Sequence, residues 1–322
     1  MPKIPISLIT GFLGSGKTSF LSEYLRTNND KGIALIINEL GQIALDQRVL
    51  KSSINYTDEQ MLYLNSGCVC CNKRLDLINS LKNLLDNYDK SGVKLKQVII
   101  ETTGLANPAP ILWTLLSDTF LSAHFSAQSV IACVDALNGF LHLQNSEARE
   151  QIVFADSVLL TKTDLQGDTK ALRAEILTLN PSLMLFDKRN LDYNELFTHS
   201  NKANFKAFES TNSHEQGFET LALSFEGAIE WSAFGVWLSL LLHKYGTQIL
   251  RVKGILDIGE DFLVSINGAM HIIHPPTHIK KDKEKGSKLV FITRNLPKER
   301  ILNSLKGFES LLGAKGLADK AL

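Results

Sequence analysis

The chain has 322 residues, which is enough for two medium domains, each with its own core. Its 34 basic and 34 acidic side chains give a formal net charge of zero, which argues against nucleic acid and anionic membrane as partners. No apolar run is long enough to span a bilayer, the N-terminus lacks a signal-peptide pattern, and three of the four cysteines are clustered. We therefore expect a reducing, cytoplasmic location, with small molecules, metals or proteins as partners.

The first half of the chain alternates short β-rich runs with amphipathic segments. We expect strands at residues 5–10, 32–38, 97–101, 129–135 and 157–162, and helices at 17–26, 74–88 and 171–181. This alternation predicts an α/β domain over residues 1–190, with a parallel sheet flanked by helices.

The second half has a different order of elements. Residues 191–216 are polar, so we expect a linker there. Beyond the linker come a strand at 219–227, a helix at 231–246, strands at 248–258, 262–268, 270–274 and 288–294, and a last helix from Pro297. This order predicts a smaller α+β domain over residues 217–322.

Residues 11–18, GFLGSGKT, match the phosphate-binding pattern G-x-x-x-x-G-K-[ST] and stand between an expected strand and an expected helix. Lys17 would neutralise the β- and γ-phosphates of a nucleotide, and the Thr18 hydroxyl would join the shell of a Mg²⁺ ion. Backbone N–H groups of the loop would surround the phosphates, namely those of Gly11, Gly14, Ser15 and Gly16. The alternative is a glycine-rich turn that binds nothing, and the strand and helix around the motif argue against it.

A second acidic partner for Mg²⁺ is expected at the end of another strand, where QVIIETTG supplies Glu101. The next residues, Thr103 and Gly104, would lie near the γ-phosphate, where a backbone N–H can respond to hydrolysis. The alternative role for Glu101 is to cap the helix that follows Pro108 or Pro110.

A base-recognition loop is expected after a later strand, where SVLLTKTD supplies Lys162 and Asp164. An aspartate carboxylate can accept from both N1–H and the N2 amine of guanine, and adenine offers no such pair. The sequence therefore favours GTP over ATP, with a solvated turn as the alternative.

Cys68, Cys70 and Cys71 lie within four positions, in SGCVCC. Three thiolates can hold Zn²⁺ or a similar ion, but a closed structural site needs a fourth ligand. An open fourth position suits a metal that is loaded and handed on. The alternatives are a buried apolar trio and a thiol–disulfide pair. Cys133, within SVIACVD, is expected in the core.

Together these motifs resemble the CobW family of metal-handling P-loop GTPases, and the resemblance covers nearly the whole chain. It rests on GFLGSGKT, NELGQIALD, SGCVCC, ETTGLANPAP, TKTD, RVKG and NGAMHIIHPP. The resemblance implies slow GTP hydrolysis and transfer of zinc, cobalt or another divalent ion to a client metalloprotein. It also implies that the transferred metal is held by Cys68, Cys70 and Cys71 and that Glu39 is a switch carboxylate at this metal.

The chain departs from the family pattern at three positions. Gln42 stands where the family often has a second glutamate, and Gln47 where it often has a histidine. Thr161 replaces the usual asparagine of the base-recognition motif, which removes an amide that could bond to the base and to the P-loop.

Three histidines in the C-terminal part, His271, His274 and His278, do not share one face of a strand, so a structural or interface role is favoured over metal binding. Two other functions remain alternatives to a metallochaperone. One is a zinc buffer with incidental GTPase activity, and the other is a P-loop phosphotransferase acting on a small metabolite. A homodimer is left open.

Overall fold

The computed structural model describes residues 2–28, 30–39, 61–65, 72–165, 167–198, 217–281 and 286–318. Gln42, Gln47 and the three clustered cysteines lie outside the described residues, and of Glu39 only the backbone is described. The chain divides into two compact units, one of residues 1–172 and 185–200 and the other of residues 173–184 and 201–322. Among the described residues, no helix has the length and apolar character needed to cross a bilayer.

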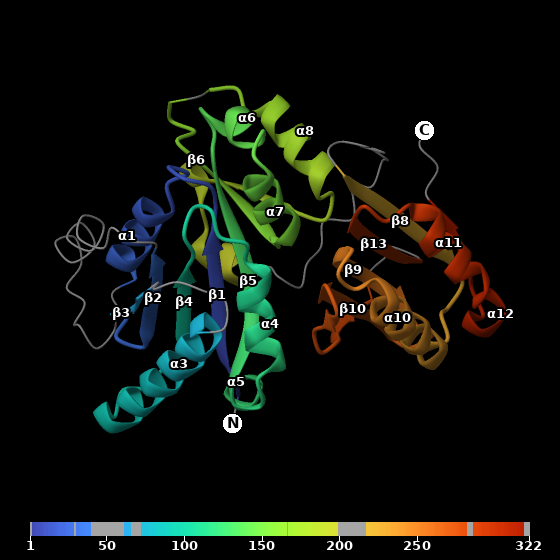
Figure 1. Ribbon diagram of the computed structural model, residues 1–322, viewed down its shortest axis with the longest axis horizontal. Helices are drawn as coiled ribbons and strands as arrows, with labels where there is room; N and C mark the ends of the chain where they lie inside the picture. Colours follow the sequence, from blue (N-terminus) through green and yellow to red (C-terminus); the bar gives the residue numbers. More distant parts are fainter. Residues whose placement is uncertain are drawn as a thin grey trace. The chain divides into compact units, whose positions relative to one another are not determined.

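The first unit is built on a seven-stranded sheet with the strand order β3-β2-β4-β1-β5-β6-β7 (Figure 1). Its pairings from β3 through β6 are all parallel. Strands of this kind are covered on both faces and therefore consist of nearly continuous apolar runs. The predicted P-loop NTPase architecture is thus confirmed. The strands are β1 (Ile4–Thr10), β2 (Ile33–Glu39), β3 (Met61–Asn65), β4 (Gln97–Glu101), β5 (Phe125–Asp135), β6 (Ser157–Thr161) and β7 (Met184–Asp187).

Helices flank this sheet, and α1 packs on it through a stripe that contains Phe20, Leu21, Tyr24 and Leu25. The same core contains Cys133, which is 1% exposed, so the prediction that this cysteine is a core residue is confirmed. The helical elements are α1 (Lys17–Thr27), α3 (Asn72–Ser91), α4 (Ala109–Ser117), α5 (Thr119–His124), α6 (Gly139–His142), α7 (Ser146–Phe154), the 3₁₀ turn η1 (Lys188–Asn190) and α9 (Tyr193–Thr198). Helix α8 (Lys170–Leu179) begins in the first unit, and its residues from Arg173 onward are assigned to the second.

Helix α9 lies in the stretch that was expected to be a linker. Leu196 and Phe197 of this helix are buried in the core of the first unit, and the Phe197 ring packs against Tyr24 with centroids 4.7 Å apart. The expected linker over residues 191–216 therefore overlaps the first unit at its start.

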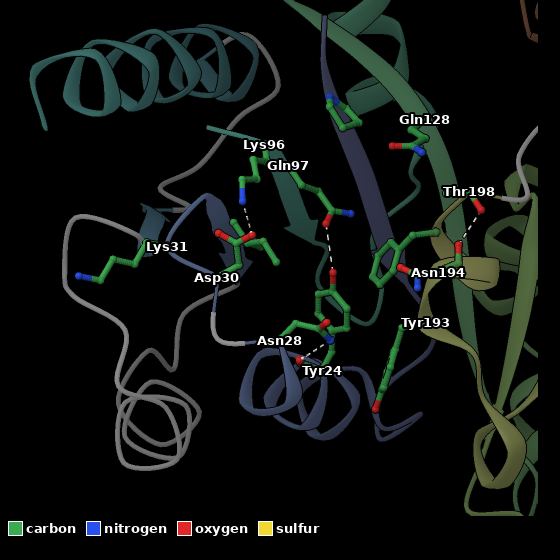
Figure 2. Close-up of a pocket in the computed structure, with 13 residues that line it drawn as sticks. Tyr24, Asn28, Asp30, Lys31, Lys96, Gln97, Gln128, Tyr193, Asn194 and Thr198 are labelled. Carbon is green, nitrogen blue, oxygen red and sulfur yellow. Dashed lines mark hydrogen bonds and ion pairs between the residues drawn. The ribbon is translucent and has the colours of Figure 1, made fainter. Parts of the chain in front are cut away.

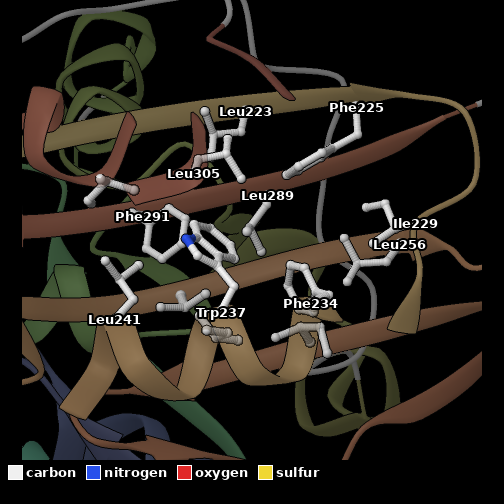
Figure 3. Close-up of a cluster of buried hydrophobic side chains, with 14 of the residues drawn as sticks. Leu223, Phe225, Ile229, Phe234, Trp237, Leu241, Leu256, Leu289, Phe291 and Leu305 are labelled. Carbon is white, nitrogen blue, oxygen red and sulfur yellow. The ribbon is translucent and has the colours of Figure 1, made fainter. Parts of the chain in front are cut away.

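The second unit contains an antiparallel sheet with the order β11-β10-β9-β13-β8-β14, to which β12 adds by pairing with β10. Helix α10 packs on one face, where the Trp237 ring meets Phe291 edge-on (Figure 3). The Trp237 Nε1–H donates to Ser304 Oγ at 3.1 Å. The predicted α+β domain is confirmed. Its elements are β8 (Phe218–Glu226), α10 (Trp231–Tyr245), β9 (Ile249–Asp257), β10 (Phe262–Ala269), β11 (Ile272–Ile273), β12 (Thr277–Lys280), β13 (Ser287–Arg294), α11 (Lys298–Lys306), α12 (Glu309–Leu312) and β14 (Lys315–Ala318).

The strand expected at residues 270–274 is much shorter in the structure. Met270 adopts a φ of 54°, a left-handed turn conformation that a strand cannot contain, so only Ile272–Ile273 pair with β10.

Candidate nucleotide-binding site

The polar strand ends of the first unit meet at one edge of the sheet. In the strand register, Ile9 of β1 is the partner of Glu101 in β4, and Asp135 of β5 is the partner of Thr161 in β6. Because the strands are parallel, their carboxyl ends lie at the same edge, which is where open α/β sheets bind ligands. The loop that follows β1 at this edge is GFLGSG.

Glycine is required at two positions of this loop. Gly16 stands immediately before α1 with a φ of 87°, in the left-handed region. At Gly11 an added Cβ would lie 2.4 Å from the carbonyl oxygen of Cys133, closer than real Cβ atoms come. The loop therefore packs directly on the backbone of β5 and leads into α1, and within it the Ser15 N–H donates to the Phe12 carbonyl oxygen at 3.1 Å.

Two side chains of the loop fit a phosphate ligand. Lys17 is 8% exposed, and its Nζ donates to the carbonyl oxygens of Gly11 at 2.7 Å and Phe12 at 3.1 Å, which holds the ammonium against the loop. The Ser15 hydroxyl is buried and has no hydrogen-bond partner in the described part of the chain. A buried hydroxyl without a partner is costly, and an anion bound in the loop would supply one.

Thr18 and Glu101 come together as the sequence predicted for two Mg²⁺ ligands. The Thr18 hydroxyl donates to Glu101 Oε1 at 2.9 Å, and Glu101 is 5% exposed. As for the capping role considered as its alternative, the N-cap residue of α4 is Pro108, and the Ala109 backbone N–H at the start of this helix donates to Asn107 Oδ1 at 2.8 Å. A hydroxyl and a carboxylate next to a phosphate loop are oxygen ligands of the kind that Mg²⁺ prefers, so the residues fit this ion.

The backbone after β4 lies directly on the P-loop. A Cβ added at Gly104 would come within 2.6 Å of Leu13 Cδ2 and 2.8 Å of the Leu13 backbone nitrogen. Only glycine allows this close approach. Gly104 therefore stands beside the loop that would hold the phosphates, as its predicted role near the γ-phosphate requires.

The loop after β6 carries the residues expected to recognise the base. Lys162 has a φ of 54°, and its Nζ donates to the Gly14 carbonyl at 2.9 Å and to Asp135 Oδ2 at 2.7 Å. The stem of Lys162 thus spans from β6 to the P-loop. The side chain of Asp164 is exposed, where an incoming base could reach it.

Asp135, at the end of β5, is a member of the site that the sequence interpretation missed. It is fully buried, and it accepts hydrogen bonds from Lys162 Nζ, from the Leu137 and Asn138 backbone N–H groups and from the Asn138 amide. Burial alone would raise the pKa of this carboxyl, but these hydrogen bonds outweigh it and the pKa is lowered. The available sequence signal was an acidic residue at the end of a buried apolar strand.

Thr161 provides one of the two contacts expected of the family's asparagine, the hydrogen bond to the P-loop. Its hydroxyl donates to the Ser15 carbonyl at 2.7 Å, so the bond between the base-recognition motif and the P-loop is present. The departure at this position therefore leaves the P-loop anchored.

The expected metal site lies outside the described residues, since it depends on Cys68, Cys70 and Cys71. Cys133 is a poor ligand because burial raises its pKa to about 12, which keeps the thiol protonated at neutral pH.

Two of the three C-terminal histidines contact neighbouring residues of the second unit. His271 Nδ1 lies 3.1 Å from the Leu242 carbonyl oxygen, and the His278 ring packs on Phe262. Across the described ranges, no three His, Cys, Asp or Glu side chains gather as a metal site would require.

A separate hollow of about 820 Å³ lies at the opposite edge of the same sheet. It is lined by residues at the starts of β1, β2 and β4 and by aromatic side chains of α1 and α9, among them Pro5, Ile33, Gln97, Tyr24 and Tyr193 (Figure 2). None of the predicted site residues lines it. The P-loop edge therefore remains the candidate site.

Two family models match the chain. Residues 5–186 match "CobW/HypB/UreG, nucleotide-binding domain", and residues 218–309 match "Cobalamin synthesis protein cobW C-terminal domain". The zinc chaperone YjiA of Escherichia coli is 30% identical over 322 residues, which cover 95% of this chain and 99% of that protein. The zinc-regulated GTPase metalloprotein activator 1 of Schizosaccharomyces pombe is 31% identical over 183 residues, which cover 55% of this chain and 44% of that protein.

A solved structure has the same fold over almost the whole chain. The crystal structure of Zn(II)-bound YjiA GTPase from E. coli has a TM-score of 0.72 and 24% sequence identity, and the match covers 96% of this chain and 99% of that one.

Proposed function

The chain belongs to the CobW/HypB/UreG family of nucleotide-binding proteins, and from this premise we propose that it is a GTP-hydrolysing metallochaperone for zinc. One relative is named as a zinc chaperone and another as a zinc-regulated GTPase metalloprotein activator, and these two names support both halves of this proposal. The client is an unidentified metalloprotein. The location of this chain in the cytoplasm stays a prediction.

The observation that carries the nucleotide half is the convergence of Lys17, Thr18 and Glu101 at the P-loop. Lys17 stabilises charge on the β- and γ-phosphates, and the Thr18–Glu101 pair would hold Mg²⁺. When bound, the ion neutralises charge that develops on the phosphates during transfer to water. GTP is favoured over ATP because the Asp164 carboxylate can accept from two donors of guanine.

The metal half rests on where the backbone enters and leaves the cysteine segment. Glu39, the last residue of β2, is the register partner of Asn65, the last residue of β3, and Ile37 is the partner of Glu101. The chain thus enters the segment with Cys68, Cys70 and Cys71 from the sheet edge that carries Glu101. Helix α3 begins at Asn72, directly after Cys71, and its N-terminal dipole favours thiolates, the form that a metal requires.

This placement supports coupling between nucleotide binding and zinc binding. The thiolates would hold the transferred Zn²⁺ (or Co²⁺), and Glu39 would change its position with the nucleotide state. By thermodynamic reciprocity, bound metal must alter nucleotide affinity if nucleotide alters metal affinity.

The test is a titration of the purified chain with Zn²⁺ against a competing chelator, without nucleotide, with GDP and with a non-hydrolysable GTP analogue. We expect the zinc affinity to differ by about tenfold between the GDP and analogue states, a typical allosteric coupling. Equal affinity in all three states would make the site a zinc buffer. Phosphate transfer from GTP to a small metabolite in place of water would indicate a phosphotransferase.

A further inference from the structure

We infer that Gln151 is a positioning residue that holds the turn after β4 in the place where it senses the γ-phosphate. This inference rests on the proposed function, because it assigns the turn to a bound triphosphate. Gln151 belongs to α7, a helix that contributes no residue to the predicted site.

The side-chain amide of Gln151 makes two hydrogen bonds to this turn. Its Nε2 donates to the carbonyl oxygens of Gly104 and Ala106, both at 3.1 Å. Gln151 is 1% exposed, so water does not compete for these bonds. Because both acceptors are carbonyl oxygens, the NH₂ group must face the turn, and this fixes the orientation of the amide.

The turn itself is short and closed. The Ala106 backbone N–H donates to the Thr103 carbonyl at 3.1 Å, so residues 103–106 form a hydrogen-bonded turn. Gln151 fixes two of its carbonyls from one side, and the contact between Gly104 and Leu13 places the turn on the P-loop. A shift of the amide would therefore move the backbone that faces the phosphates.

The neighbouring residue of α7 adds a second attachment. Asn107 Nδ2 donates to Glu150 Oε2 at 2.6 Å, and Asn107 Oδ1 accepts from the Ala109 backbone N–H at the start of α4. Adjacent positions of α7 thus hold both the turn and the entry to α4. This arrangement links the turn to a rigid helix.

Gln151 also lines a small cavity beside the P-loop. Gln151 Oε1 is buried without a partner in the described chain, and the same cavity is lined by Phe12 and His142 of the first unit. The hydrogen bonds from Nε2 to the Gly104 and Ala106 carbonyl oxygens therefore fix the position of this side chain.

The experiment compares Gln151→Met with wild type. Methionine has nearly the same volume and length but no donor, so it removes both bonds while filling the space. The matched control is Gln97→Met, which removes a glutamine that bonds to Tyr24 at the opposite edge of the sheet. Affinities for GDP and for a non-hydrolysable GTP analogue are measured by competition with a fluorescent nucleotide, together with single-turnover hydrolysis.

We expect Gln151→Met to keep the wild-type GDP affinity within about twofold and to lose about tenfold in both analogue affinity and hydrolysis, about the effect of a hydrogen bond lost from a buried site. A uniform loss for both nucleotides would show a merely structural role and would overturn the inference. Wild-type behaviour of Gln151→Met would overturn it as well. If wild type itself binds neither nucleotide, the proposed function fails together with the inference.

Hydrogen exchange on the wild-type protein gives a second test that does not depend on how the variant folds. Amides of residues 103–106 should exchange more slowly with the GTP analogue than with GDP, because the turn would be held from both sides. Equal exchange in the two states would contradict the inference.

Discussion

The Thr161 hydroxyl donates a 2.7 Å hydrogen bond to the carbonyl oxygen of Ser15, joining the end of β6 to the P-loop across 146 residues of sequence. Thr161 is 3% exposed, so the bond is shielded from water. The loop that would hold the phosphates and the loop that would recognise the base are therefore joined to each other as well as to the sheet.

Replacing Thr161 by valine should loosen this connection without changing the volume of the side chain. We expect a loss of about 1–3 kcal/mol in the free energy of unfolding, because the Ser15 carbonyl stays buried and loses a donor. Nucleotide affinity should fall as well. Urea denaturation and nucleotide titration measure the two effects, with Thr119→Val on an exposed helix start as the control. A variant as stable as wild type would show that the bond contributes nothing.

Lys17→Ala should abolish GTP hydrolysis and leave the fold intact. The Lys17 ammonium donates to two carbonyl oxygens of its own loop, and its charge would face the phosphates of a bound nucleotide. Turnover is measured by phosphate release and folding by circular dichroism, with the exposed Lys94→Ala as the control. Normal turnover in a folded variant would refute the assignment of the P-loop.

Asp164→Ala should erase the preference for GTP over ATP. The carboxylate is the proposed acceptor for the N1–H and N2 donors of guanine, and a site that loses such a group discriminates poorly. Competition of both nucleotides against a fluorescent GDP reports the preference, and Asp76→Ala on α3 is the control. Equal binding of GTP and ATP by the wild-type protein would argue against the role of Asp164.

Cys70→Ser and Cys71→Ser should each weaken Zn²⁺ binding strongly, because a serine hydroxyl is a poor substitute for a thiolate. Glu39→Ala should instead reduce the difference in zinc affinity between the GDP and GTP-analogue states. Chelator competition measures both quantities. Cys133→Ala is the matched control, because its thiol is buried and protonated. A strong loss of zinc binding in that control would contradict the assignment.

His142 should make stability depend on pH. Burial is the main cause that lowers its pKa from the ordinary 6.5, so the unfolded chain takes up a proton before the folded chain does. The stabilisation from neutral His142 is complete above pH 6.5 and is lost as the pH falls toward the lowered folded pKa. His142→Gln should therefore lose less unfolding free energy than wild type on acidification, measured by urea denaturation at each pH with the exposed His243→Gln as the control. Parallel pH curves for wild type and His142→Gln would rule out this effect.

Much of the first unit could be predicted because its strands are buried on both faces and therefore form continuous apolar runs. Residues 157–162 were expected as a strand, and β6 spans Ser157–Thr161. The approach of Thr18 to Glu101 also followed from topology, since the carboxyl ends of parallel strands meet at one edge.

The missed features depend on contacts between residues far apart in the sequence. Helix α9 is six residues long and leads into a polar stretch, and its burial comes from tertiary packing of Leu196 and Phe197. Gln151 acts through hydrogen bonds to remote groups, and Asp135 accepts one from Lys162, 27 residues away; such bonds leave no periodic pattern in the sequence. Gln151 and Gly104 are 47 residues apart.

The bond between Thr161 and Ser15 also bears on how the protein is made. The P-loop leaves the ribosome early, yet β1 beside it needs β4 and β5 as neighbours, and the loop itself is anchored by β6. A nascent chain that stops before residue 161 therefore has the phosphate-binding motif without the hydroxyl that anchors it. Ligand binding stabilises only the state that can bind, so nucleotide can support folding only after β6 has emerged and paired. Capture of nucleotide by the growing chain would thus mark the pairing of β6 with the sheet.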